Sequence, residues 1–351
     1  MAGSRVARKQ AGFSLVELMV SMVLGLMLIA GAVSIYLASK RSYVEVEQVA
    51  AVTENARFSE QIMGDALRHI GFLGAVTPNK VEVASSLTAT ALAGDCTTPA
   101  EAGAYNFARL GYAATATTAN VLGCIADAYV PATGPKNDVL VVKHVLPQPY
   151  TDGPREGRDP NDPYMTIDTP GPLQNGKVYV MTNSVGGLLF DGSLPPSIST
   201  GGQYPGGSAW PYQYEVFYVR LPVGETVPRL SRRVLSYNSG TAAMEFVTED
   251  LAEGVESLQL LFGYDSDNDG EVDTYTDPVA VTASNGWSAV ESVEAFMLIR
   301  SATRDAQYTD AKTYQLGGGV TAGPFNDNYR RLISHTSVSL RNLKLIIRGD
   351  A

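Results

Sequence analysis

Near its N-terminus the chain has one long stretch without a charged side chain. After Glu17, residues 18–37 are all apolar or small, and the next charges are Lys40 and Arg41. Twenty residues of α-helix extend about 30 Å, which matches the hydrocarbon thickness of a bilayer. The pattern therefore predicts a membrane-spanning helix. By the positive-inside bias, the basic segment before it stays in the cytoplasm and the bulk after it is exported.

Beyond the apolar run, hydrophobic residues recur in alternating steps of three and four. This spacing is typical of one face of an amphipathic helix, and it comprises Val49, Val52, Ala56, Ser59, Met63, Ala66 and Ile70. Gly71 and Gly74 then supply a stop signal. We expect one helix over residues 13–74, with residues 13–37 in the membrane, followed by a β-rich head of residues 75–351.

The rest of the chain alternates between strand-like segments and turn-rich segments. Runs rich in Val, Ile, Leu, Phe and Tyr predict strands at residues 138–145, 177–181, 213–221, 255–264, 293–300 and 334–347. Residues 147–172 and 192–207 are dense in Pro, Asp and Gly, so they are expected to form surface loops. The predicted fold class is α+β, with one long helix packed on an antiparallel sheet.

Composition narrows the choice of function. The 351 residues are 45% hydrophobic and 18% charged, which is typical of a folded chain. The formal net charge of -10 argues against nucleic acid as a partner, because phosphate binding needs a basic surface. The basic residues Arg5, Arg8 and Lys9 precede the apolar run without any acid, so their removal would make the chain more acidic still.

A polar site lies before the apolar run, whereas an ordinary secretory signal is cut after its apolar region. Gly12, Phe13 and Glu17 make up this site. It resembles the class III signal of type IV prepilins, in which a dedicated peptidase cuts after the glycine and methylates the new N-terminal amine. The resemblance implies a cleaved leader of residues 1–12, cleavage between Gly12 and Phe13, and N-methylation of Phe13.

Glu17 is unusual at the start of a membrane helix. A carboxylate there costs roughly 2.5 to 3.5 kcal/mol at full depth and less near the interface. In one interpretation Glu17 snorkels to the headgroups. In the other, which the prepilin resemblance implies, it pairs with the N-terminal amine of a neighbouring subunit and fixes the axial register during assembly.

Acidic residues occupy alternate positions in one short segment, at Asp265, Asp267, Asp269, Glu271 and Asp273. This is the opening of a calcium loop, in which Gly270 permits the sharp turn and the next residue offers its backbone carbonyl. Position twelve of such a loop would be Thr276 rather than Glu, and the flanking residues are strand-like. Two interpretations stay open: a Ca²⁺ site, or an acidic turn between strands at residues 255–264 and 272–276.

The two cysteines, Cys96 and Cys124, lie in Gly- and Ala-rich sequence without a histidine at metal-ligand spacing, which argues against zinc. In an exported head they would most simply form one disulfide, worth roughly 3 kcal/mol. Two unpaired thiols are the alternative. The three histidines lie far apart in the sequence, and no catalytic motif is present, so we do not expect an enzyme.

Several segments of the last third resemble the head of PilW-type minor pilins. They comprise residues 214–220, 253–258, 263–265 with the acidic turn, 296–301 and 329–342. Residues 80–207 carry no such resemblance. In that family the subunit joins other minor pilins in a complex that primes pilus assembly and sits near the tip, often with a PilY-type adhesin.

The resemblance also implies partners and location. The expected partners are the prepilin peptidase, the inner membrane, other minor pilins, the major pilin and a PilY-type adhesin. The head would be periplasmic first and would reach the cell surface in the pilus. A minor pseudopilin of a type II secretion system shares the leader and helix, but the large head favours the pilus. A membrane-anchored periplasmic binding protein, the third class, predicts that Phe13 and Glu17 are dispensable.

Overall fold

The computed structural model describes residues 12–88, 92–150, 173–198, 201–267, 269–284 and 286–342. Outside the described residues lie most of the predicted leader, much of the loop predicted at 147–172, and the end of the strand predicted at 334–347. The chain divides into two compact units, residues 1–50 and 51–351.

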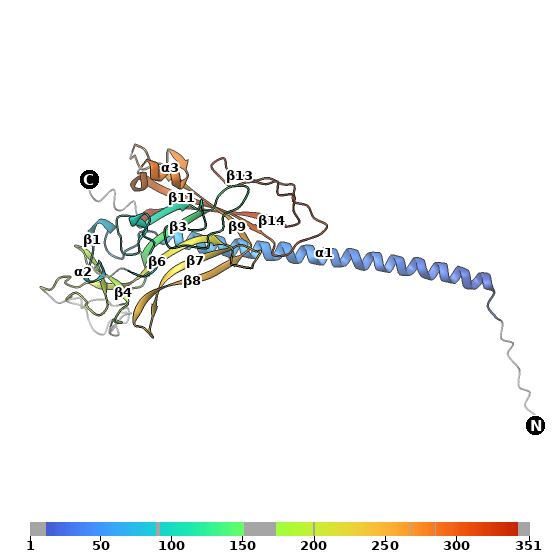
Figure 1. Cartoon of the computed structure of the whole chain (residues 1–351), viewed down its shortest axis with the longest axis horizontal. Helices are drawn as coiled ribbons and strands as arrows, with labels where there is room; N and C mark the ends of the chain where they lie inside the picture. The colour runs from blue at the N-terminus through green and yellow to red at the C-terminus, as the bar shows by residue number, and fades with distance from the viewer. Residues whose placement is uncertain are drawn as a thin grey trace, which may run out of the picture. The chain divides into compact units, whose positions relative to one another are not determined.

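Helix α1, Leu15–His69, is continuous over 55 residues and is drawn in blue in Figure 1. By its length and composition, this helix is able to cross a membrane. Its apolar side chains in the first unit are exposed. After its end, Gly71 and Gly74 adopt φ angles of 76° and 81°, which glycine accepts without steric cost.

In the second unit, α1 buries the predicted apolar face. The buried side chains are Val52, Ala56, Ser59, Met63, Ala66 and Ile70. Leu67 and Leu73, which the spacing did not include, are buried as well. The first residue of the predicted face, Val49, is 48% exposed, so the buried face differs from the prediction there.

The larger sheet has eight strands in the order β1-β5-β4-β6-β3-β2, and β7 and β8 continue from β6. Neighbouring strands are antiparallel except the parallel pair β1 and β5. The strands are β1 Val81–Val83, β2 Gly111–Thr115, β3 Asp138–Val145, β4 Val178–Thr182, β5 Gly187–Asp191, β6 Ser208–Arg220, β7 Arg229–Asn238 and β8 Ala243–Glu253.

The second sheet is antiparallel, with strand order β10-β9-β11-β14. Its strands are β9 Val255–Tyr264, β10 Thr274–Thr276, β11 Val290–Arg300 and β14 Arg331–Ser339. The remaining elements are short: α2 Ser85–Thr88, α3 Pro278–Ala283, the 3₁₀ turns Pro78–Lys80, Ala100–Ala102 and Gly286–Ala289, and the paired strands β12 Tyr314–Gln315 and β13 Thr321–Ala322.

Side chains at the start of β3 join the two sheets. Asn137 accepts a hydrogen bond from the backbone N–H of Leu258 at 3.0 Å and donates one to the carbonyl of Glu256 at 3.3 Å. Asp138 accepts from the backbone N–H of Leu260 at 2.8 Å. These side chains therefore satisfy polar backbone groups of β9 as a neighbouring strand would.

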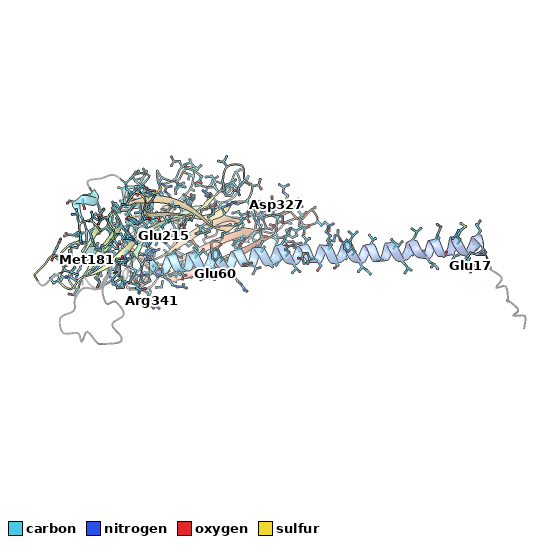
Figure 2. All side chains as sticks on the ribbon, turned by 90° about the horizontal axis from the view of Figure 1, so that it is seen from below. Glu17, Glu60, Met181, Glu215, Asp327 and Arg341 are labelled. Atoms are coloured by element: carbon cyan, nitrogen blue, oxygen red, sulfur yellow. A yellow bond between two sulfur atoms is a disulfide. The ribbon has the colours of Figure 1, made fainter. Side chains whose placement is uncertain are left out.

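The chain that follows α1 is fastened to β3 by its backbone. The Gly71 N–H donates to the carbonyl of Lys143 at 3.2 Å, and the Val145 N–H donates to the carbonyl of Phe72 at 2.8 Å. From the other side, the Asn342 side chain donates to the carbonyls of Arg68 and Ile70. The helix is thus tied to the large sheet and to the segment after β14. Figure 2 labels Glu60, which accepts a hydrogen bond from Ser334 of β14.

The strand predictions succeeded best where strands are fully buried. The bounds of β3 and β9 are those predicted, and β6 extends further toward the N-terminus than expected. The last strand was predicted too long, because β14 ends at Ser339, and Leu340 makes one further backbone hydrogen bond, to the carbonyl of Glu291. The strand predicted at 272–276 spans only Thr274–Thr276, and β7 and β8 were not predicted.

Candidate functional site

The predicted processing site lies in exposed, non-helical backbone just before α1. Gly12 and Phe13 are both exposed, and the side chain of Phe13 is 85% accessible. A side chain built at Gly12 would have no heavy atom within 4 Å. The peptide bond between these residues is therefore free of packing, which is what access by a peptidase requires.

Glu17 forms a reciprocal pair with Ser14 at the first turn of α1. The Glu17 N–H donates to the Ser14 hydroxyl oxygen at 3.2 Å, and the Ser14 N–H donates to the Glu17 carboxylate at 3.5 Å. This arrangement is a capping box, which satisfies two backbone donors that a helix start would leave unpaired. Sequence reasoning missed Ser14, although the Ser-x-x-Glu signature was there to be found. Figure 2 labels Glu17 at this end of α1.

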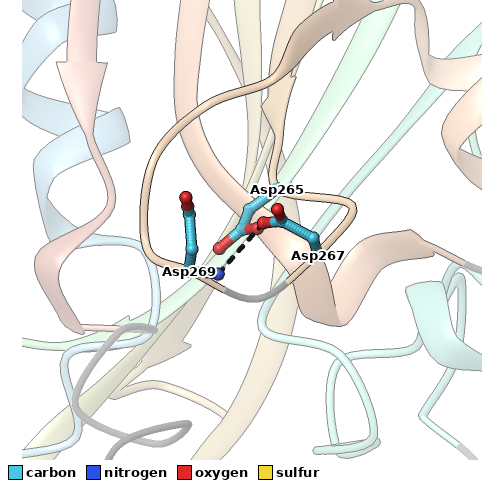
Figure 3. Close-up of side chains that lie close together, drawn as sticks. All are labelled: Asp265, Asp267 and Asp269. Atoms are coloured by element: carbon cyan, nitrogen blue, oxygen red, sulfur yellow. Dashed lines mark hydrogen bonds between the residues drawn. The ribbon is translucent and has the colours of Figure 1, made fainter.

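The acidic turn after β9 gathers three of the five predicted ligands. Asp265, Asp267 and Asp269 each offer a carboxylate oxygen, and these oxygens all lie within 4.8 Å of one another (Figure 3). Asp265 is buried, whereas the other two side chains are exposed. Carboxylate oxygens are the ligands that hard divalent cations prefer, so this cluster could hold a metal ion.

Backbone hydrogen bonds shape the turn around these carboxylates. Asp265 accepts from the Gly270 N–H at 2.8 Å, and Asp267 accepts from the Asp269 N–H at 3.2 Å, which is the dashed line in Figure 3. Gly270 has a φ of 91°, as a sharp turn of this kind requires. The predicted role of glycine in the turn is therefore confirmed by its conformation.

The two remaining acids lie outside the cluster. Asp273 accepts hydrogen bonds from the hydroxyl of Ser266 at 2.6 Å and from its N–H at 2.7 Å, and these bonds lower the pKa of Asp273. The side chain of Glu271 is exposed, and its N–H donates to Asp269. The hydrogen bonds between Ser266 and Asp273 therefore hold the two ends of the turn together.

Cys96 and Cys124 form a disulfide, so the predicted pairing is confirmed and the alternative of two free thiols is wrong. The loop that the disulfide closes is fastened to the large sheet from beneath. The hydroxyl of Tyr214 donates to the carbonyl of Ala102 at 2.9 Å, and that of Tyr212 donates to the carbonyl of Ala104. The disulfide and these two hydrogen bonds from β6 therefore tie this region to the rest of the head.

Lys143 lies wholly buried under the same loop. Its ammonium group donates to the carbonyls of Glu101 at 2.7 Å and Asn106 at 2.6 Å. Burial lowers the pKa of Lys143 to about 7, although the nearby Asp95 and Glu101 act in the opposite direction. Lys143 therefore stabilises the loop through its two hydrogen bonds, whereas removal of its charge from water costs free energy.

The histidines, distant in sequence, have close neighbours in the fold. The rings of His69 and His144 stack with centroids 5.3 Å apart. The Nε2 atom of His144 lies 3.6 Å from the carboxylate of Glu215, which also pairs with Arg232 at 2.7 Å. Burial alone would raise the pKa of Glu215, but its contacts with His144 and Arg232 lower it. No local sequence pattern indicates this contact, because its members come from separate elements.

A buried arginine organises the end of the smaller sheet. Arg331 pairs with Asp310 at 2.9 Å, with Asp327 at 2.6 Å and with Glu256, and its guanidinium lies 3.7 Å from the ring centre of Phe325. These acids raise the pKa of Arg331, against the effect of burial. The network ties β14 to β9 and to the segment before β14, and Figure 2 labels Asp327 in that segment.

Comparisons with known proteins address both ends of the chain. Residues 7–33 match the family model described as the prokaryotic N-terminal methylation motif, which covers Gly12, Phe13 and Glu17. Residues 216–342 match the model of the Type IV Pilus-assembly protein W, which begins in β6 and includes the acidic turn and Arg331. Residues 34–215 lie outside both matches.

Among solved structures, a type IV-like pilin from Thermus thermophilus is 15% identical to this chain. The match covers 48% of this chain and 86% of that one, with a TM-score of 0.22. No curated protein matches the sequence significantly.

An N-terminal methylation motif on a capped apolar helix, followed by a head of antiparallel-rich sheets, defines a type IV pilin-like protein. The family match over residues 216–342 of the head narrows the class of pilin-like proteins that this chain resembles. Its head carries a region similar to the Type IV Pilus-assembly protein W family over residues 216–342, and its N-terminus carries the methylation motif of prepilins. The matched families and the fold are those of structural proteins.

Proposed function

We propose that this chain is a PilW-type minor pilin, which joins other minor pilins in the complex that primes pilus assembly and sits near the pilus tip. The observation that carries the proposal is the PilW match over residues 216–342 on a chain that also bears the N-terminal methylation motif. Its partners would be other minor pilins, the major pilin and a PilY-type adhesin. Its head would be periplasmic before assembly and at the cell surface afterwards.

In this proposal the chain has three parts with separate tasks. The prepilin peptidase removes residues 1–12 by cutting between Gly12 and Phe13, and Phe13 is then N-methylated. Residues 13–37 anchor the subunit in the inner membrane. The head, residues 75–351, makes the contacts that distinguish this subunit from its neighbours. The exposed backbone at Gly12 and the apolar side chains of α1 support these assignments.

Deletion of the gene tests the proposal. We expect the loss or severe reduction of surface pili, with normal secretion of exoproteins, and restoration by the wild-type gene. Chemical cross-linking of membranes should link the head to other minor pilins. Normal piliation together with a secretion defect would favour a type II pseudopilin instead. A membrane-anchored binding protein would leave both pili and secretion intact.

We further propose that Asp265, Asp267 and Asp269 bind Ca²⁺, with the Glu271 carbonyl and Asp273 nearby. Three convergent carboxylates and the sharp turn at Gly270 support a site for a hard cation. The ligand set is incomplete, so the expected dissociation constant is on the order of 10⁻⁴ to 10⁻³ M, as in extracellular modules. Bound calcium would stabilise the turn by mass action.

A further inference from the structure

A stripe of aromatic and basic side chains follows the apolar run of α1. Tyr36, Lys40 and Tyr43 are spaced by four and then three residues, which places them on one face of the helix. Arg41 lies beside Lys40. The two tyrosines are 66% and 70% exposed, and both basic residues are exposed. We call Tyr36, Lys40, Arg41 and Tyr43 the boundary stripe.

The length of the helix sets where this stripe would lie in a bilayer. Glu17 and Lys40 are separated by helix without a charged residue. At 1.5 Å per residue this separation is about 34 Å, slightly more than the hydrocarbon thickness of about 30 Å. With Glu17 at one boundary, the boundary stripe therefore lies in the headgroup layer of the opposite leaflet, the position that tyrosine prefers.

The charge pattern around the stripe identifies the complementary group. The next charged residues along the helix are acidic, Glu45 and Glu47, and the whole chain has a net charge of -10. Lys40 and Arg41 thus place two positive charges between the apolar run and an acidic remainder. Lysine and arginine recognise phosphate, and anionic headgroups attract basic residues that lie next to a membrane segment.

We propose that the boundary stripe binds the headgroups of anionic phospholipids in the periplasmic leaflet and so fixes the depth of the subunit before assembly. This inference rests on the proposed membrane anchoring of residues 13–37. The phosphate and the negatively charged headgroup pair with Lys40 and Arg41, while the tyrosine rings pack at the glycerol level. Release of these lipids would then accompany transfer of the subunit from the bilayer into the pilus.

Quenching of a tryptophan placed in the stripe tests the proposal. The full chain carrying Tyr36→Trp is reconstituted into vesicles that contain brominated phosphatidylglycerol or brominated phosphatidylcholine. The same chain with Tyr36 intact corrects for Trp210 and Trp287 of the head. We expect brominated phosphatidylglycerol to quench with a preference of about fivefold or more, since each basic residue near an anionic surface contributes about 1 kcal/mol.

Charge variants identify the residues responsible. Lys40→Gln with Arg41→Gln should bring the lipid preference close to one. The control, Arg57→Gln with Lys80→Gln, removes the same charge from exposed positions elsewhere and should keep the preference. If both lipids quench equally in the chain with Lys40 and Arg41 intact, the proposed binding of anionic lipid by the boundary stripe is wrong, but the membrane anchoring still holds. The absence of quenching by either lipid would instead overturn the membrane anchoring itself.

Discussion

The carboxylate of Asp138, the first residue of β3, accepts a hydrogen bond from the backbone N–H of Leu260 in β9 at 2.8 Å. Its other oxygen accepts from the hydroxyl of Thr115 at 2.7 Å. One buried acid thus bridges the two sheets of the head. Because burial raises the pKa of Asp138 to about 7, against the lowering effect of these two bonds, this bridge titrates near neutral pH.

The first prediction concerns the contribution of Asp138 to the pH dependence of stability. Its pKa in the unfolded chain is about 3.9, so between about pH 4 and 7 the folded state binds more protons than the unfolded state. This group therefore makes the free energy of unfolding decrease as pH rises through that window. Asp138→Asn can accept from Leu260 and donate to Thr115, and it should remove this contribution. Denaturant unfolding at several pH values measures it, and an unchanged pH profile in the variant would contradict it.

The second prediction is that Lys143 makes stability change with pH in the opposite direction. Lys143 has a pKa of about 7 in the fold and about 10.4 in the unfolded chain, so the unfolded state binds more protons between those values. The contribution of Lys143 to stability therefore rises as pH increases from 7 to 10. Lys143→Met should flatten this part of the profile. It should also leave two carbonyls without donors, at a cost of about 1–3 kcal/mol for each.

The third prediction separates two roles of Glu17. Ser14→Ala removes one hydrogen bond of the capping box and should cost about 1 kcal/mol of helix stability, while Glu17 stays available to a neighbouring subunit. Glu17→Ala removes the charge and the bond from the Ser14 N–H, while the backbone N–H of residue 17 still donates to the Ser14 hydroxyl. If Glu17 pairs with a neighbour's amine, Glu17→Ala should insert in the membrane yet assemble poorly, whereas Ser14→Ala should assemble well. Equal assembly defects, measured by recovery in sheared pili, would assign the effect to the cap.

The fourth prediction is the mature N-terminus. Cleavage after Gly12 gives a chain that begins at N-methylated Phe13, and mass spectrometry of the N-terminal peptide measures it. Replacement of Gly12 by a bulky residue should leave the leader attached, because the exposed backbone there must enter the peptidase. Ala11→Ser, a small change next to the site, serves as the control. A mature chain that starts elsewhere would contradict the proposed processing.

The fifth prediction is calcium dependence. The melting temperature of the head should rise when calcium exceeds its dissociation constant, and Asp267→Ala with Asp269→Ala should abolish the rise. Glu271→Ala is a matched control, because its exposed side chain lies outside the cluster and only its backbone carbonyl is a proposed ligand. Identical melting in calcium and in chelator would mean that the acidic turn is only a solvated loop.

The elements predicted best are those whose hydrophobic pattern in the sequence matches their burial in the fold. Helix α1 follows from an unbroken apolar run and a repeating face, and β3 and β9 follow from runs that are buried on both sides. Strands β7 and β8 were missed because they are rich in charged residues. The structure explains them by cross-strand pairs such as Arg232 with Glu249 at 2.6 Å.

The candidate sites divide in the same way. The processing residues and the acidic turn are contiguous in sequence, so short local motifs, one resembling a prepilin signal and one the opening of a calcium loop, pointed to them. The pairing of Arg331 with Glu256 joins residues far apart in the chain, and the stack of His69 on His144 joins α1 to β3. Contacts of this kind depend on tertiary packing, which no local pattern encodes.

The backbone bonds between the end of α1 and β3 have a mechanical consequence. In a pilus under tension, a load along α1 would enter the head through the buried face of the helix and through these bonds at its end. Gly71 and Phe72 share that load between two backbone bonds to β3, and Asn342 adds two more to the last turn. Because β3 lies between β2 and β6, the force passes into an interior strand that is held on both sides. The sheet would then resist as a unit, rather than unzip from an edge.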